Sequence, residues 1–359
     1  MKKLIFSLIL FILPIKVSAI SASSTIVMDL NSNRVLFEQN IHEQRLIASI
    51  TKIMTAIVAI EYGNLDDTYE VGEEVLKAYG SAIYIEMGEK LTLRDLLYGL
   101  MLRSGNDAAV VIAKNIAGSM EAFAMLMNET ASKIGMTNSY FYNAHGLEND
   151  DGTGNLSTAY DMALLTKYAM ENETFREIFG TKKYSVKTNK KSYSWTNKNR
   201  LLHEYDFITG GKTGFTQKAR RTLVTTASSN NIDLVIVTLN DPNDFDDHLA
   251  LYTKIFKNYE AIKVLDKNKF EIKEDTKYKN DTLYINNDVY IPVLKEEKDD
   301  ISIKYELFKN SNYMNGDVVG NAKIYIKDEL VKSVNIYVQK NQGKENLSWW
   351  NKLLRWLGW

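Results

Sequence analysis

Three short strings carry the chemistry that this sequence offers. They occur in the order Ser49-Ile-Thr-Lys52, Ser104-Gly-Asn106 and Lys212-Thr-Gly214. An acyl-transferring serine enzyme needs a hydroxyl nucleophile, a base that removes its proton, and groups that hold the substrate. The residue types in the three strings supply each of these parts.

The first string opens an apolar stretch from Ile50 to Tyr62, which stops at Gly63. A glycine there is typical of a helix C-terminus, so the stretch predicts a buried helix. Residues three apart share one face of a helix, which brings the Ser49 hydroxyl and the Lys52 amine together. Burial lowers the pKa of a lysine and lets it act as a base. For this string alone, the alternative is an ordinary helix start with a solvated lysine.

The second string lies between two helical runs, Leu91 to Leu102 and Asp107 to Ile116. It predicts a tight turn between the helices, in which Gly105 permits the bend. Ser104 offers a hydroxyl for passing a proton, and Asn106 offers an amide that grips a peptide group. A plain turn followed by a helix cap is the alternative.

The third string follows two glycines and precedes a run from Thr222 to Ala227 that predicts a strand. We therefore expect Lys212, Thr213 and Gly214 on a strand at the edge of a sheet. The lysine and the threonine would offer a cation and a hydroxyl to a substrate carboxylate, and the glycine would let the backbone come close to it. A glycine-rich hairpin with an exposed lysine is the alternative.

Taken together, the strings resemble the signature of class A β-lactamases and penicillin-binding proteins. The chain is most similar to the low-molecular-mass penicillin-binding proteins that are serine-type D-alanyl-D-alanine carboxypeptidases. The similarity covers most of residues 20 to 260 and rests on Val27-Met-Asp-Leu30, Ala48-Ser-Ile-Thr-Lys-Ile-Met-Thr55, Ser104-Gly-Asn-Asp-Ala-Ala109, Asn143-Ala-His-Gly-Leu147, Ser157-Thr-Ala-Tyr-Asp-Met-Ala163, Asn199-Arg-Leu-Leu202 and Gly211-Lys-Thr-Gly-Phe-Thr216.

The resemblance implies catalytic roles for four residues. Ser49 would attack the carbonyl between the two terminal D-alanines of a peptidoglycan stem peptide, and Lys52 would take its proton. Ser104 would pass a proton to the departing D-alanine. The backbone N–H groups of Ser49 and Phe215 would form the oxyanion hole. A β-lactam antibiotic would acylate the same serine.

The resemblance also implies how the substrate is held. Asn106 would bind the acyl side chain. Lys212 and Thr213 would bind the terminal carboxylate, with Gly214 allowing the close approach of the backbone and Phe215 beside it. Neither a cofactor nor a metal ion enters this chemistry.

Other activities on the same fold are alternatives. Class A β-lactamases have Asp where this chain has Gly105, and they use a Glu-x-x-x-Asn string for deacylation that is absent between Ser104 and Lys212. Both differences favour the carboxypeptidase. A β-lactamase, a D,D-endopeptidase or a non-catalytic penicillin-binding sensor stays open as an alternative, although the catalytic strings of a sensor would be expected to have decayed.

The composition excludes several function classes. The formal net charge of the 359 residues is −1, so no basic excess points to nucleic acid as a partner. The sequence has no cysteine, which excludes thiol nucleophiles, disulfides and cysteine-bound metals. Of the four histidines, we expect His145 to order a loop and His248 to lie on the surface face of a helix.

The order of elements predicts the fold class. A hairpin formed by Thr25 to Leu30 and Arg34 to Glu38 is followed by helical runs, by strands over 222–227 and 234–239, and by a helix from Asp246 to Tyr259. This order predicts an α+β domain over residues 20–262, in which helices flank an antiparallel sheet. Short alternating segments over 263–345 predict a small β-sandwich domain.

The two ends of the sequence predict where the protein works. In residues 1–19, two lysines, an apolar run and Val17-Ser-Ala19 form a secretory signal with cleavage after Ala19; retention as an uncleaved anchor is the alternative. Four of the five tryptophans lie in residues 349–359. Residues 346–359 therefore predict an amphipathic helix on a membrane surface, or else a tail docked on this protein or a partner. We expect an exported enzyme, peripherally anchored at the extracytoplasmic face of the cytoplasmic membrane.

Overall fold

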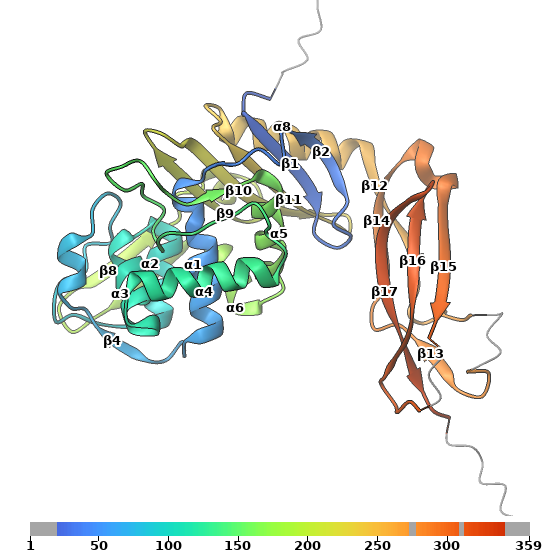
Figure 1. Cartoon of the computed structure of the whole chain (residues 1–359). Coiled ribbons are helices and arrows are strands. Elements are labelled where there is room, and N and C mark those ends of the chain that lie inside the picture. The colour runs from blue at the N-terminus through green and yellow to red at the C-terminus, as the bar shows by residue number, and fades with distance from the viewer. Residues whose placement is uncertain (1–19, 273–277, 309–311, 342–359) are drawn as a thin grey trace, which may run out of the picture.

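The computed structural model describes residues 20–272, 278–308 and 312–341. These residues form a larger unit of helices around a sheet and a smaller unit of strands (Figure 1). The expected signal sequence at 1–19 and the expected amphipathic helix at 346–359 lie outside the described residues. Within the described ranges, no single helix is both long and apolar enough to cross a bilayer.

A five-stranded antiparallel sheet with strand order β2-β1-β11-β10-β9 forms the centre of the larger unit. Its strands are β1 (Ser24–Asp29), β2 (Val35–Gln39), β9 (Ile208–Thr216), β10 (Arg220–Ser229) and β11 (Ile232–Leu239). Apolar side chains alternate along β11, with Leu234 and Ile236 in one core cluster and Val235 and Val237 in another. Both faces of the sheet are therefore covered. The expected hairpin is confirmed, and so is the position of the third string on an edge strand.

Helices cover the two faces of the sheet. Helices α7 (Arg200–Glu204) and α8 (Asp244–Asn258) contact one face, and α5 (Ala159–Met170) contacts the other. Helix α1 (Lys52–Tyr62) lies deepest, because it contacts α2 (Leu93–Arg103), α3 (Asn106–Ala117), α4 (Met120–Lys133), α5 and α6 (Glu173–Phe179). Its residues 52–59 are all buried, as expected for a helix that is apolar all round.

Shorter elements complete the larger unit. They are the 3-10 helices η1 (Ala48–Thr51) and η2 (Glu73–Lys77) and the paired strands β3 (Arg45–Leu46) with β6 (Leu156–Ser157), β4 (Thr68–Glu70) with β5 (Lys90–Thr92), and β7 (Lys183–Lys187) with β8 (Ser192–Thr196).

The expectation for His248 is wrong. Its side chain has 0% exposure and lies between α8 and the sheet, with Nδ1 at 2.7 Å from Thr225 Oγ1 and Nε2 at 3.0 Å from Thr238 Oγ1. Burial lowers the pKa of His248 to about 3, so the ring stays neutral. The two threonine hydroxyls satisfy both ring nitrogens, which is why a polar residue can occupy this core position.

The smaller unit contains two sheets that share one apolar core. The sheets are β12 (Tyr259–Leu265) with β14 (Val289–Leu294), and β13 (Thr282–Tyr284), β17 (Glu329–Gln339), β16 (Val318–Ile326) and β15 (Ile301–Leu307) in that order; the 3-10 helix η3 (Lys295–Asp300) joins β14 to β15. This is the expected β-rich domain. Its first strand begins at Tyr259 and runs across the expected domain boundary between residues 262 and 263. The boundary itself stays a prediction.

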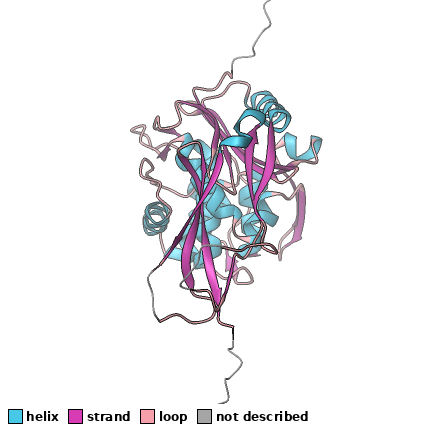
Figure 2. Cartoon of the chain, turned by 90° about the vertical axis from the view of Figure 1, so that its right-hand side faces the viewer, coloured by secondary structure: helices cyan, strands magenta, loops and turns pink. Residues whose placement is uncertain are grey.

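The turn between β1 and β2 connects the two units. The Arg34 guanidinium donates to the carbonyl of Pro292 and forms an ion pair with Glu297, and Lys332 Nζ donates to the carbonyl of Asn31. In the view from the smaller unit, its long strands stand in front of the helices of the larger one (Figure 2). Residues of β14, η3 and β17 in the smaller unit thus hold the β1–β2 turn of the larger one.

Candidate active site

Ser49 lies in η1, the 3-10 turn that leads into α1. The helix starts at Lys52, two residues later than the sequence predicts, because Ala48 has a left-handed backbone with φ +48°. Gly146, with φ +87°, packs against the Ala48 carbonyl so closely that a Cβ there would collide with it. Asn155 Nδ2 donates to Thr51 Oγ1 at 3.0 Å. The loop at 143–155 therefore holds the serine turn in a strained conformation of the kind that recurs at functional sites.

Lys52 is fully buried, and its Nζ lies within hydrogen-bond distance of three oxygens. These are Ser49 Oγ at 3.0 Å, Asn106 Oδ1 at 2.7 Å and the His145 carbonyl at 2.6 Å. Burial, reinforced by the positive charge of Lys198, lowers the pKa of Lys52 to about 7. A neutral amine has two N–H groups, which donate to the Asn106 amide oxygen and the His145 carbonyl oxygen. Its lone pair is then left for the Ser49 hydroxyl proton.

Ser104 lies between α2 and α3, in the interhelical turn that the sequence predicts. It has a left-handed backbone with φ +63°, and its buried Oγ has no hydrogen-bond partner in the described part of the chain. An unpaired buried hydroxyl costs about 1 to 3 kcal/mol, so its presence needs an explanation. A hydroxyl held for a substrate atom or for proton transfer explains it.

Asn106 is the first residue of α3, and both the oxygen and the nitrogen of its side-chain amide form hydrogen bonds. Its Oδ1 accepts from Lys52, and its Nδ2 donates to the Tyr79 carbonyl at 2.6 Å. The next residue, Asp107, accepts from the backbone N–H groups of residues 83–85. The carboxylate therefore fixes segment 83–85 beside the turn, and Asn106 keeps one amide hydrogen for a ligand.

The third string reaches the serine through direct backbone packing. A Cβ on Gly214 would lie 2.9 Å from the Ser49 nitrogen, so only glycine lets β9 approach this closely. Thr222 Oγ1, on the neighbouring strand, donates to the Ile47 carbonyl at 3.1 Å and fixes the same contact. The structure thus brings the first and third strings together, as the sequence predicts.

Lys212 is buried on the same strand, contrary to the alternative of an exposed hairpin lysine. Its Nζ donates to the Thr213 carbonyl at 2.7 Å. Burial, followed by repulsion from Lys52 and Lys198, holds the pKa of Lys212 well below its ordinary value. Thr213 is half-buried, and the Phe215 side chain is exposed.

Sequence reasoning missed three contributors to the site. The His145 carbonyl binds Lys52, Lys198 adds positive charge, and the Glu148 carboxylate accepts from the Thr216 hydroxyl and so ties the loop at 143–155 to β9. The string Asn143 to Leu147 was the only signal for the loop. The expected loop-ordering role of His145 is confirmed, because its Nδ1 accepts from the Leu147 N–H at 3.1 Å.

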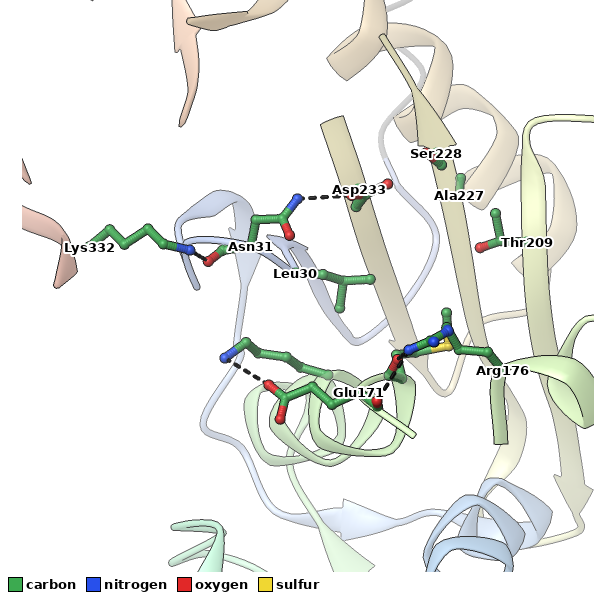
Figure 3. Close-up of a pocket in the computed structure, with 11 residues that line it drawn as sticks. Leu30, Asn31, Glu171, Arg176, Thr209, Ala227, Ser228, Asp233 and Lys332 are labelled. Carbon is green, nitrogen blue, oxygen red and sulfur yellow. Dashed lines mark hydrogen bonds and ion pairs between the residues drawn. The ribbon is translucent and has the colours of Figure 1, made fainter. Parts of the chain in front are cut away.

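A separate cavity of about 710 Å³ lies between the sheet, the end of α5 and Lys332 of β17 (Figure 3). The Asn31 amide donates to Asp233 at 2.8 Å, Lys167 and Glu171 lie 3.7 Å apart, and Lys332 is held by the Asn31 carbonyl. None of the residues predicted to form the site lines this cavity. Its charged side chains are engaged by one another or by neighbouring amide and carbonyl groups, and we assign it no chemistry.

The fold and the three assembled strings define the class of penicillin-binding proteins with a C-terminal β domain. A family model described as D-alanyl-D-alanine carboxypeptidase matches residues 14–243, and one for the C-terminal domain of penicillin-binding protein 5 matches residues 259–344. The chain belongs to the D-alanyl-D-alanine carboxypeptidase family.

Curated relatives carry the same name. D-alanyl-D-alanine carboxypeptidase DacF of Bacillus subtilis is 34% identical over 60% of this chain, and DacC of Escherichia coli is 34% identical over 69%. The matches span 56% and 64% of the lengths of these two relatives. DacA of Haemophilus influenzae is 28% identical over 94% of this chain and 89% of its own length.

Solved structures that are similar to this chain carry names from the same family. The crystal structure of penicillin-binding protein 5 from Haemophilus influenzae has a TM-score of 0.73 and 26% identity, over 90% of this chain and 98% of that one. A D-alanyl-D-alanine carboxypeptidase from Mycobacterium tuberculosis has a TM-score of 0.63 and 30% identity, over 67% of this chain and 92% of that one.

The packing of Gly214 predicts a large effect of one methyl group. Gly214→Ala should reduce acylation of the protein by a fluorescent penicillin roughly 100-fold, because β9 must move away from Ser49. Gly118→Ala is the matched control: a Cβ there meets open space, but the backbone is left-handed with φ +82°. It should lower the free energy of unfolding by about 1 to 2 kcal/mol and leave acylation unchanged. Equal acylation rates for the two variants would contradict the proposed packing constraint.

Proposed function

We propose that this protein is a serine D,D-carboxypeptidase that removes the terminal D-alanine from peptidoglycan pentapeptide stems through an acyl-enzyme on Ser49. The observation that carries the proposal is the buried Lys52 amine, held 3.0 Å from Ser49 Oγ by two other acceptors. The names of the relatives support the same reaction over a β-lactamase, an endopeptidase or a sensor.

Acylation begins when neutral Lys52 takes the Ser49 proton and Ser49 Oγ attacks the carbonyl between the two D-alanines. The negative charge on the carbonyl oxygen is held by the backbone N–H groups of Ser49 and Phe215. As the carbon–nitrogen bond breaks, the proton passes from Lys52 through the Ser104 hydroxyl to the nitrogen of the leaving D-alanine. The unpaired state of the Ser104 Oγ supports this relay.

Substrate binding uses the remaining predicted residues. Lys212 and Thr213 hold the terminal carboxylate, the remaining Asn106 amide hydrogen binds the acyl side, and Gly214 brings the strand backbone to the serine. Deacylation reverses the proton path: Lys52 takes a proton from water, the water oxygen attacks the ester, and the proton returns to Ser49 Oγ. A β-lactam enters the same first step as a mimic of the substrate.

The proposed location is the extracytoplasmic face of the cytoplasmic membrane, after cleavage of the signal sequence behind Ala19. Periplasmic or wall peptidoglycan is the substrate, so the active unit must be exported. The tryptophan-rich residues 346–359 anchor it peripherally, with the aromatic side chains at the interface and the cations toward anionic headgroups.

Release of D-alanine tests the reaction directly. The full chain should release free D-alanine from a peptide ending in D-Ala-D-Ala and should be labelled by a fluorescent penicillin at one serine. Ser49→Ala should abolish both, because no nucleophile remains, whereas Ser132→Ala on the exposed end of α4 should change neither. If wild type releases no D-alanine, or Ser49→Ala releases as much as wild type, the proposed function is wrong.

The lowered pKa of Lys52 predicts how acylation depends on pH. Below about pH 7 the amine is protonated and cannot accept the serine proton, so the rate of penicillin acylation should fall about tenfold per pH unit. Above pH 7 the rate should level off. Lys52→Arg, which stays protonated, should lose at least about 100-fold at pH 8. A flat rate between pH 5 and pH 8, with circular dichroism unchanged, would exclude Lys52 as the base.

Deletion of residues 346–359 tests the anchor. The truncated protein should move from the membrane fraction to the soluble fraction of the exported compartment while it keeps its rate of D-alanine release. Trp350→Lys within the full tail should weaken membrane association, and Asn351→Gln, its neighbour in the sequence, should not. Truncated protein that remains with membranes would refute the anchor and leave the carboxypeptidase proposal standing.

A further inference from the structure

Two carboxylates lie against the first described residues of the chain. The Ser21 N–H donates to Asp247 Oδ2 at 2.6 Å, and Ser21 Oγ lies 2.8 Å from Asp241 Oδ1 and 2.7 Å from Asp247 Oδ2. Asp241 lies in the connection between β11 and α8, and Asp247 lies in the first turn of α8, with exposures of 0% and 6%. Asp241 Oδ1 also accepts from the Asn243 N–H at 3.1 Å, but the single hydroxyl hydrogen of Ser21 cannot serve both carboxylates at the same time.

This pair of carboxylates lacks positive charge. Asp241 Oδ2 has no hydrogen-bond partner, and neither carboxylate forms an ion pair within the described ranges. The nearby cations are engaged elsewhere: Arg221 of β10 pairs with Asp244, and Arg200 of α7 pairs with Asp246. Burial and the charge of Asp247 raise the pKa of Asp241 to about 6. Buried carboxylates without a cation are rare, because desolvation is costly.

We propose that Asp241 and Asp247 form the binding site for the chain's own α-ammonium group, which is created at Ile20 when residues 1–19 are removed. In the uncut chain the nitrogen of Ile20 is a neutral amide. Cleavage after Ala19 breaks that amide bond with water, leaves the carboxylate on Ala19, and gives Ile20 an amine that is protonated at neutral pH. The proposal rests on the proposed export, not on the carboxypeptidase reaction.

Covalent geometry keeps the new ammonium near the site. Successive backbone nitrogens are about 3 to 4 Å apart, so the Ile20 nitrogen lies within roughly 6.5 Å of Asp247 Oδ2. Ile20 packs at the edge of the core cluster beneath α8, which restricts where its amine can go. The ammonium supplies the positive charge that the carboxylates lack and a donor for Asp241 Oδ2. Pairing would tie the start of β1 to β11 and α8 only in the processed protein.

The charged groups around the site fix the expected pH dependence. Asp241 and Asp247 form the site, Asp244 and Asp246 of the same helix are paired with Arg221 and Arg200, and His248 on that helix is neutral. The carboxylates favour the protonated amine, so its pKa is raised above the ordinary value of about 7.7 to 8.0. The added stability is therefore largest between the pKa of Asp241, about 6, and about pH 7.7, and it is lost as the pH rises through the raised pKa of the amine.

The test measures the pKa of the α-amine in the full chain. A protein that starts at Ile20 is released from an N-terminal fusion by a protease that leaves no extra residue. Competitive labelling with isotopic acetic anhydride across pH, read by mass spectrometry of the N-terminal peptide, gives the pKa. We expect a value at least about one unit above 8. A form that keeps Gly-Ser-Gly before Ile20 should show an ordinary value and a lower midpoint of thermal unfolding at pH 7.

Variants separate the site from general charge effects. Asp241→Asn and Asp247→Asn should each lower the raised pKa of the amine, whereas Asp246→Asn, an exposed carboxylate in the same helical turn, should not. An ordinary amine pKa in the protein starting at Ile20 overturns the proposal, even if one variant fails to fold. An exported protein whose mass shows another first residue overturns the assignment to Ile20. D-alanine release from the same sample reports separately on the proposed function.

Discussion

The removal of the Lys52 amine from water is the constraint on which the rest of the active site depends. Desolvation brings the pKa of this amine to about 7, which provides the neutral form that the proposed base requires. The amine stays neutral only if no nearby carboxylate stabilises its protonated form. The structure meets this condition by giving Lys52 two neutral acceptors, the Asn106 amide and the His145 carbonyl. The Asp107 carboxylate raises the pKa of Lys52, but its oxygens are engaged by the backbone of residues 83–85.

Three separate parts of the chain supply this environment, and each explains a feature of the fold. Helix α1 is surrounded by five helices, which excludes water from the lysine. The loop at 143–155 delivers the His145 carbonyl and packs Gly146 under the serine turn. Edge strand β9 closes the site from the other side, where Gly214 meets the Ser49 backbone. The left-handed residues Ala48 and Ser104 lie where these parts meet, and the surrounding packing holds their local strain at the site.

The sequence predicted those features that depend on residue type and spacing. The nucleophile and base on one turn, the interhelical position of Ser104 and the edge strand with Lys212 all follow from periodicity, glycine placement and motif chemistry. The 3-10 turn and the His145 carbonyl could not be predicted in this way, because any residue has a carbonyl and a backbone contact leaves no mark in the sequence. The error on His248 has a related cause: its acidic neighbours suggest a surface, whereas two threonines far away in the sequence satisfy the ring.

The presence of a second buried lysine shows how substrate binding and proton transfer are linked. Lys52 and Lys212 repel each other, so this pair of lysines resists carrying two positive charges. In the proposed mechanism the substrate brings a carboxylate to Lys212, and this negative charge favours the protonated form of that lysine. A protonated Lys212 in turn disfavours a proton on Lys52, which therefore stays a free base while the substrate is bound. A peptide that lacks the terminal carboxylate would leave both lysines competing for one proton, so the charge of the substrate helps to keep Lys52 ready to take the proton of the attacking Ser49 hydroxyl.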